Sequence, residues 1–163
     1  MTDQTVAAQD QAGAFTGRCQ CGAITYRFSN APDFVANCWC RDCQRASGGV
    51  MATYFSVALD DFELLSGTPE RYPYVADSGN TLERAFCPDC GARLFNLALS
   101  GFPGQMFVML GSLDDPERVQ PPIMEIFTAH RISWTPVLDV PQYRARPDAA
   151  PGSTEGREIG GCG

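Results

Sequence analysis

Hydrophobic and polar residues alternate along several short stretches of the chain, a pattern typical of half-buried β-strands. The stretch "AITYRF" (23–28) alternates in this way directly after "CQCG". The stretch "VMATYFSVAL" (50–59) is long and rich in β-branched and aromatic residues, which favours a central strand. Further strands are predicted within residues 71–86, 93–99, 105–110 and 123–130.

Turn and helix signals divide these strands. Ser78-Gly79-Asn80 predicts a turn that splits residues 71–86 into two strands, the second running into Cys87. One short helix is predicted after Cys43, over residues 44–47, because two glycines follow and stop it. The elements together predict a mainly β fold of small, mostly antiparallel sheets.

The same pattern predicts the domain organisation. Residues 14–146 form one domain without repeats or a long linker, a size at which a chain can bury a core. Residues 1–13 are expected to be a flexible polar arm, and the Gly- and Pro-rich residues 147–163 a disordered tail.

Charge and composition narrow the classes of partner. The net charge is −7, which argues against nucleic-acid binding, since that needs a basic surface. Every basic side chain is arginine and none is lysine; because arginine presents a planar fork of donors, a positive pocket in this chain would suit carboxylates. No segment resembles a signal peptide, and none reaches the roughly 20 apolar residues of a membrane span. We therefore expect a cytoplasmic protein with no membrane partner.

The eight cysteines carry the candidate chemistry. In a reducing compartment they indicate metal ligands or reactive groups more than disulfides. Cys19 and Cys21, in "CQC", are expected to point to one side of an extended segment, and Cys87 and Cys90 form a CxxC knuckle ended by Gly91. Two such pairs predict a closed, structural Zn²⁺ site with four thiolates; two disulfides or free thiols are the alternatives.

A second group, Cys38, Cys40 and Cys43, offers three ligands and no obvious fourth. A zinc ion with three thiolates and one exchangeable position is typical of a reactive site, and it suits thiol chemistry better than hydrolysis. His130 is the one histidine and a possible fourth ligand, while Cys162 lies in the Gly-rich tail. The alternatives are a second structural zinc or a cysteine pair that cycles through a disulfide.

Five stretches, "GRCQCGAITYRF", "CWCRDCQRASGG", "RAFCPDCGARLF", "GSLDDP" and "EIFTAHRISW", cover roughly Thr16 to Tyr143. In this order they resemble the glutathione-dependent formaldehyde-activating (GFA) family, which also includes centromere protein V. The resemblance implies a β-tent fold of small antiparallel sheets stapled by two zinc ions. It implies a structural zinc on Cys19, Cys21, Cys87 and Cys90 and a second zinc on Cys38, Cys40 and Cys43, beside a glutathione pocket.

The activity implied is that of a carbon–sulfur lyase, which condenses glutathione with formaldehyde to S-(hydroxymethyl)glutathione. A similar thiol and another small aldehyde are alternative substrates, and assembly into a homo-oligomer is possible. The carboxylates of glutathione need cationic partners, and Arg41, Arg45 and Arg93 lie beside the metal motifs. They are the candidate glutathione contacts.

The chain departs from the family pattern at two positions. Trp39 stands where the family commonly has the histidine of C-H-C, and Glu125 stands where it commonly has the histidine of His-Ile. Trp39 either packs over the metal or marks the loss of a histidine beside the reacting carbonyl. A non-catalytic, zinc-stabilised binding module is therefore the alternative to an enzyme, and a thiol redox protein is a third hypothesis.

Overall fold

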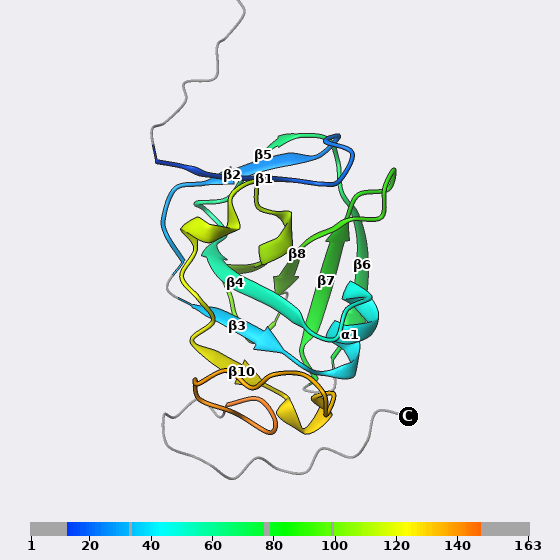
Figure 1. The fold of residues 1–163 in the computed structure, drawn as a ribbon. Helices are drawn as coiled ribbons and strands as arrows, with labels where there is room; N and C mark the ends of the chain where they lie inside the picture. Colours follow the sequence, from blue (N-terminus) through cyan, green and yellow to red (C-terminus); the bar gives the residue numbers. More distant parts are fainter. Residues whose placement is uncertain (1–12, 33, 77–78, 99, 148–163) are drawn as a thin grey trace, which may run out of the picture.

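The computed structural model describes residues 13–32, 34–76, 79–98 and 100–147; the predicted arm up to residue 12 and the predicted tail from 148 lie outside the described residues. Within them the strands form two sheets (Figure 1). The smaller sheet contains β1 (Phe15–Arg18), β2 (Thr25–Phe28) and β5 (Glu63–Ser66). The larger sheet contains, in spatial order, β10 (Met124–Ile126), β3 (Val35–Cys38), β4 (Ala52–Ala58), β9 (Gln105–Met109), β8 (Arg93–Ala98), β7 (Thr81–Phe86) and β6 (Glu70–Val75).

All neighbouring strands pair antiparallel except β10 and β3, which are parallel. One α-helix, α1 (Arg41–Ser47), follows β3. Three 3₁₀ turns complete the elements: η1 (Leu110–Ser112), η2 (Pro116–Arg118) and η3 (Thr128–His130). The predicted fold class, mainly β with small sheets in one domain, is confirmed.

Every predicted strand segment contains a strand, and the segment 71–86 contains two, β6 and β7. The pattern missed β1, β3 and β5. All four residues of β3 are buried, and all four of β5 are exposed, so neither strand shows the alternation on which the prediction depends. β1 does alternate, but it is only four residues long.

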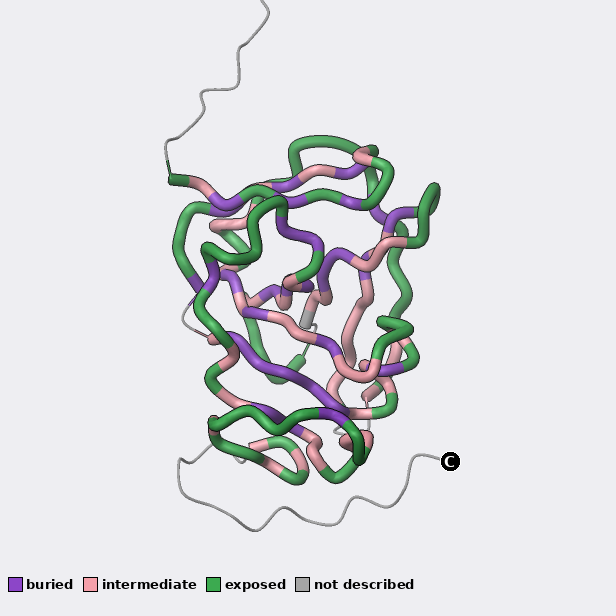
Figure 2. The backbone as a smooth tube through the Cα atoms, viewed as in Figure 1, coloured by how far each residue is buried: buried purple, intermediate pink, exposed green. Residues whose placement is uncertain are grey.

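The hydrophobic core lies between the two sheets (Figure 2). The ring of Phe28 in β2 stacks on Phe15 of β1 with centroids 4.9 Å apart, and it contacts Phe55 of β4 at 5.4 Å. These aromatic contacts join the small sheet to the large one. Both sheets therefore depend on a single core.

A close contact in this core fixes the 3₁₀ turn η1. Tyr26 is fully buried, and its hydroxyl shares a hydrogen bond of 2.6 Å with Ser112 Oγ. The Tyr26 ring passes over Gly17, where a Cβ atom would lie 2.2 Å from the Tyr26 hydroxyl oxygen. Glycine is required at position 17 because any side chain would occupy the space of the tyrosine.

Helix α1 begins three residues earlier than predicted and ends where the glycines predict. Cys40 is its N-cap, and the Cys40 sulfur accepts a hydrogen bond from the backbone N–H of Cys43 at 3.3 Å. Gly48 ends the helix in the left-handed conformation, with φ of 67°. The helix therefore starts within the second cysteine motif and fixes the positions of its sulfurs.

Candidate metal centres and the adjoining cavity

The first cysteine group is assembled from two turns that are distant in the sequence. The sulfurs of Cys19, Cys21, Cys87 and Cys90 lie within 4.8 Å of one another. Cys19 and Cys21 sulfurs are 3.5 Å apart, and Cys21 and Cys87 sulfurs are 3.8 Å apart. Tetrahedral zinc with bonds of 2.3 Å to sulfur requires sulfurs about 3.8 Å apart, so this group fits the ion.

The local conformation of the first pair differs from the prediction. Cys19 and Cys21 lie in the tight turn between β1 and β2, closed by a hydrogen bond from Gly22 N–H to the Cys19 carbonyl, and not in an extended segment. The second pair forms the predicted knuckle, in which Gly91 has φ of 72° and its N–H bonds to the Cys87 carbonyl. Both pairs thus present their sulfurs from turns.

The second group, Cys38, Cys40 and Cys43, lies where β3 passes into α1, and its three sulfurs are also within 4.8 Å of one another. Cys38 is buried, whereas Cys40 and Cys43 are half-buried. Among the described residues, no histidine or carboxylate joins this group as a fourth ligand. His130, the candidate for that role, is exposed, and its carbonyl accepts a hydrogen bond from Gln44.

Electrostatics favour a cation at the second cysteine group. Hydrogen bonding to Cys38 and Cys43 lowers the pKa of Cys40 to about 3, so one thiolate forms readily. Hydrogen bonding with that thiolate raises the pKa of Cys38 well above its usual value, with burial adding to the effect. A divalent cation would offset the repulsion that opposes further ionisation. The two cysteine groups together can hold two metal ions, consistent with zinc.

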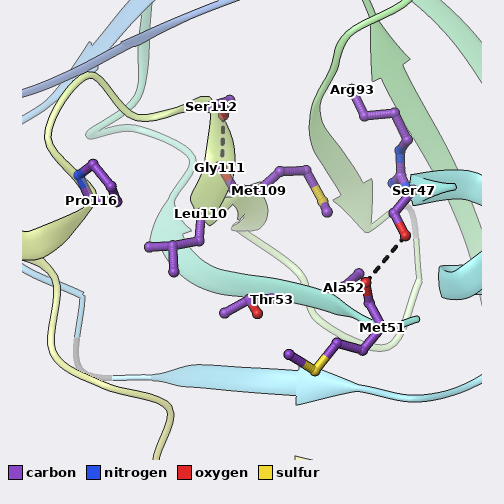
Figure 3. A pocket seen from close by; sticks show the side chains of 10 residues that line it. All are labelled: Ser47, Met51, Ala52, Thr53, Arg93, Met109, Leu110, Gly111, Ser112 and Pro116. Carbon is purple, nitrogen blue, oxygen red and sulfur yellow. Dashed lines mark hydrogen bonds between the residues drawn. The ribbon is translucent and has the colours of Figure 1, made fainter. Parts of the chain in front are cut away.

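A cavity of about 460 Å³ adjoins the second group (Figure 3). Its lining comes from the end of α1, the start of β4, the start of β8, the end of β9 and the turns η1 and η2: Ser47, Met51, Ala52, Thr53, Arg93, Met109, Leu110, Gly111, Ser112 and Pro116. None of the three sulfurs lines it directly. Ala52 lines the cavity and is paired with Cys38 between β4 and β3. The cavity therefore lies next to the second cysteine group.

The three candidate arginines differ in their surroundings. Arg41 and Arg45 are exposed on α1, and Arg41 donates a hydrogen bond to the Gln44 side chain. Neither lines the cavity. Arg93 lines it and is half-buried, with Nη2 donating to Asn96 Oδ1 at 2.5 Å. The structure thus places only Arg93 of the three at the cavity, and glutathione contacts by all three remain predictions.

The two departures from the family pattern contact each other. Trp39 and Glu125 are both buried, and the indole Nε1 of Trp39 donates a hydrogen bond of 3.1 Å to Glu125 Oε1. Arg131 stacks its guanidinium on the Trp39 ring, 4.3 Å from the centroid, and donates to Glu125 Oε2 at 2.6 Å. Gln142 adds a further hydrogen bond of 2.7 Å to the same oxygen.

This network lies on the side of β3 opposite the metal group. Glu125 pairs with Asn37 between β10 and β3, and the Asn37 amide donates to Glu125 Oε1 at 3.4 Å. Since side chains alternate along a strand, Asn37 and Trp39 face one side and Cys38 the other. The described polar contacts of the Trp39 ring are with Glu125 and Arg131.

The network keeps Glu125 ionised. Burial alone would raise the pKa of this carboxyl, but hydrogen bonds from Arg131, Gln142, Asn37 and Trp39 outweigh burial and lower it to about 2. Sequence reasoning noted Glu125 only as a replaced histidine. Glu125 is the single carboxylate inside the apolar stretch "IMEIF" (123–127), and this pattern in the sequence indicates a buried carboxylate with a basic partner.

Comparison with known proteins agrees with this architecture. The family model described as glutathione-dependent formaldehyde-activating enzyme matches residues 14–130. A crystal structure of a Rhodobacter sphaeroides protein is similar, with a TM-score of 0.51 and 23% identity, over 65% of this chain and 91% of that chain. At that identity the likeness shows the fold alone. No curated protein matches this chain.

One β domain with two cysteine groups that could each hold a metal ion defines a small, cysteine-rich protein. The family match covers more than half of the residues and includes the seven cysteines of both groups. The chain belongs to the glutathione-dependent formaldehyde-activating enzyme family. Among its described residues, no helix has the length and apolar character needed to cross a membrane.

Proposed function

We propose that the protein is a cytoplasmic, zinc-dependent carbon–sulfur lyase that joins glutathione, or a similar thiol, to formaldehyde or another small aldehyde. Family membership supports this reaction class. The observation that carries the proposal is the second cysteine group, which offers three sulfurs and, among the described residues, no fourth protein ligand. The first group, with four sulfurs, is proposed as a structural zinc site.

Cys38, Cys40 and Cys43 would hold the second zinc ion and leave one position of a tetrahedral sphere for a guest. When bound, the metal supplies positive charge that favours the thiolate form of an incoming thiol. Half-burial of Cys40 and Cys43 gives a ligand access to this group. Full burial of Cys38 keeps its sulfur away from solvent.

The addition of a thiol to an aldehyde conserves protons. The thiol loses one proton, the sulfur bonds to the carbonyl carbon, and the carbonyl oxygen gains a proton to give a hemithioacetal. The cavity hydroxyls are already engaged, since Ser47 donates to the Met51 carbonyl and Ser112 to the Met109 carbonyl. The protein's contribution in this proposal is to position the thiolate, with water carrying the proton.

The alternative function is a non-catalytic, metal-stabilised binding module. The Trp39–Glu125 network favours it, because both positions where the family commonly has histidine are occupied by groups that bind each other. Neither side chain faces the second cysteine group. A reaction that needs a histidine as acid or base would therefore be lost.

Exchange spectroscopy by NMR tests the choice between the two functions. Mixtures of glutathione and formaldehyde interconvert spontaneously with their adduct, so the measured quantity is acceleration of that exchange by the protein. We expect acceleration by the native protein and by Cys162→Ser, and none by Cys40→Ser with its fold intact. A native protein that holds two zinc ions and does not accelerate exchange would identify the binding module.

A further inference from the structure

We propose that Arg84 and Arg93 form a carboxylate-binding subsite beside the second cysteine group, so that the substrate carries a carboxylate next to its reacting thiol or carbonyl. This inference rests on the proposed function for the identity of the reacting groups. The binding of a carboxylate is independent of turnover and is tested separately.

Three guanidinium nitrogens carry the argument. Nε and Nη1 of Arg93 and Nη2 of Arg84 are buried and have no hydrogen-bond partner among the described residues. A buried donor without a partner costs about 1–3 kcal/mol, and more when it is charged. Proteins seldom leave such groups unpaired, so a ligand that accepts from them is the physical explanation.

No acidic side chain neutralises these two arginines within the described part of the chain. The ion pairs found there join Arg18 to Asp114, Arg27 to Glu63, Arg71 to Glu83 and Arg131 to Glu125. Burial, followed by the neighbouring charge of Arg84, lowers the pKa of Arg93. Two like charges are thus held close together without an acidic partner.

Neighbouring side chains hold the two guanidinium groups in place. The ring of Tyr74 on β6 supports Arg84, whose Cζ lies 3.8 Å from the ring centroid. Asn96 on β8 accepts from Nη2 of Arg93 and leaves Nε and Nη1 free. In Figure 3 the Arg93 side chain runs from β8 toward Ser47 at the end of α1, on the opposite side of the cavity from Pro116.

A carboxylate is the ligand chemistry that matches this arrangement. The Nη1 nitrogen of Arg93 and the Nη2 nitrogen of Arg84 can each donate to one oxygen of a carboxylate, and such charge-assisted hydrogen bonds are among the strongest in proteins. Formaldehyde has no such group. Glutathione carries two carboxylates, and a small oxo acid such as glyoxylate carries one beside its aldehyde. The subsite would recognise the carboxylate of either molecule in the same way.

The competing explanation is that the arginines only balance the charge of the cysteines. Cys43 and Cys40 contribute electrostatically to Arg93, and three thiolates around a divalent cation carry a net negative charge. That role predicts loss of metal on removal of Arg93, with equal weakening of charged and uncharged ligands. A subsite predicts discrimination between them.

Calorimetry with matched ligand pairs distinguishes the two roles. The pairs are glutathione with its diethyl ester, and glyoxylate with glycolaldehyde; each pair differs in the presence of free carboxylate. The proteins are the native chain, Arg93→Gln, Arg93→Lys, Arg84→Gln and, as a matched control, Arg71→Gln on the exposed strand β6. Zinc per chain is measured for each, so that a misfolded variant is recognised.

We expect the native protein to bind the carboxylate member of at least one pair about 10-fold or more tightly than its neutral partner. Arg93→Gln removes this preference, Arg93→Lys and Arg84→Gln reduce it, and Arg71→Gln retains it. A preference within the thiol pair identifies a thiol carboxylate, and one within the carbonyl pair identifies an oxo acid. Equal affinity within both pairs for the native protein, or equal losses for all ligands in Arg93→Gln, would overturn the subsite. Both outcomes are measured as binding affinities and do not depend on turnover.

Discussion

Replacing Glu125 by glutamine tests the buried network that joins Glu125 to Trp39 and Arg131. Glutamine keeps the size of the side chain and removes its charge. Glu125 is 1% exposed and its partner Arg131 is 12% exposed as side chains, so the substitution leaves a nearly buried guanidinium without its counter-charge. The loss of stability should therefore be large.

Two separate arguments give about the same loss in the free energy of unfolding. The pKa of Glu125 is lowered from 4.5 to about 2, which corresponds to about 3 kcal/mol in favour of the ionised form. Removing one partner of a buried ion pair typically costs about 3–5 kcal/mol. We expect Glu125→Gln to lower the free energy of unfolding by about 3 kcal/mol at neutral pH.

Urea denaturation of both proteins, followed by circular dichroism at several pH values, measures this difference. Because the pKa of Glu125 is lower in the folded than in the unfolded state, its contribution is complete above about pH 4.5 and disappears as the pH falls toward 2. The gap between native protein and variant should shrink over that range. The native protein and the variant are compared at each pH at which circular dichroism shows that both are folded.

Trp39→Phe provides an independent check of the same network. It removes the indole N–H that donates to Glu125, and the double variant Trp39→Phe/Glu125→Gln should show a coupling of about 1 kcal/mol. A loss below about 1 kcal/mol for Glu125→Gln at neutral pH, or a gap that does not change with pH, would refute the role assigned to Glu125.

The core and the metal groups give three further predictions. Gly17→Ala would place a methyl group 2.2 Å from the hydroxyl oxygen of Tyr26 and should cost about 1–3 kcal/mol in urea denaturation; an unchanged midpoint would contradict the close packing. Cys90→Ser should release one zinc ion and lose the strand signal in circular dichroism, and a folded variant with both ions would argue against a structural role. Lowering the pH from about 7.5 to about 5.5 should release zinc from the group of three sulfurs before the group of four, because protons compete for the thiolates. A chromogenic chelator measures the zinc that is released. Simultaneous release from both groups would contradict this order.

β2 alternates between half-buried and buried residues and was predicted from that alternation, whereas β4 was predicted from its length and its β-branched and aromatic residues. β3 could not be found in this way, because one side of it faces the Glu125 network and the other the second cysteine group, and all four residues are buried. Its sequence, "VANC", carries no period-two signal.

The cysteine groups could be predicted because short spacing brings sulfurs together whatever the surrounding fold. The arginine pair could not. Arg84 and Arg93 belong to different strands, and the register between β7 and β8 shifts between Ala85 and Phe86, which leaves one extra residue in β8. Only the folded structure shows that the two arginines lie near each other and that Arg93 lies near Cys43.

The hydrogen bond between Trp39 and Glu125 could likewise not be predicted from the sequence. Each position differs from the family pattern, yet they are 86 residues apart and meet through the parallel pairing of β10 with β3. A tryptophan N–H and a carboxylate complement each other as donor and acceptor. The two side chains therefore form one hydrogen-bonded pair in the folded protein.

Cobalt substitution is the most direct test of whether Cys38, Cys40 and Cys43 hold a metal with one position open to a thiol. The absorption of cobalt–thiolate bonds counts the sulfurs bound, and the two groups supply four and three. We expect the intensity of seven thiolates without glutathione and of eight with it, and no increase in Cys40→Ser. Eight from the outset, with Cys162 as the added ligand, or seven unchanged by glutathione, would contradict an open position.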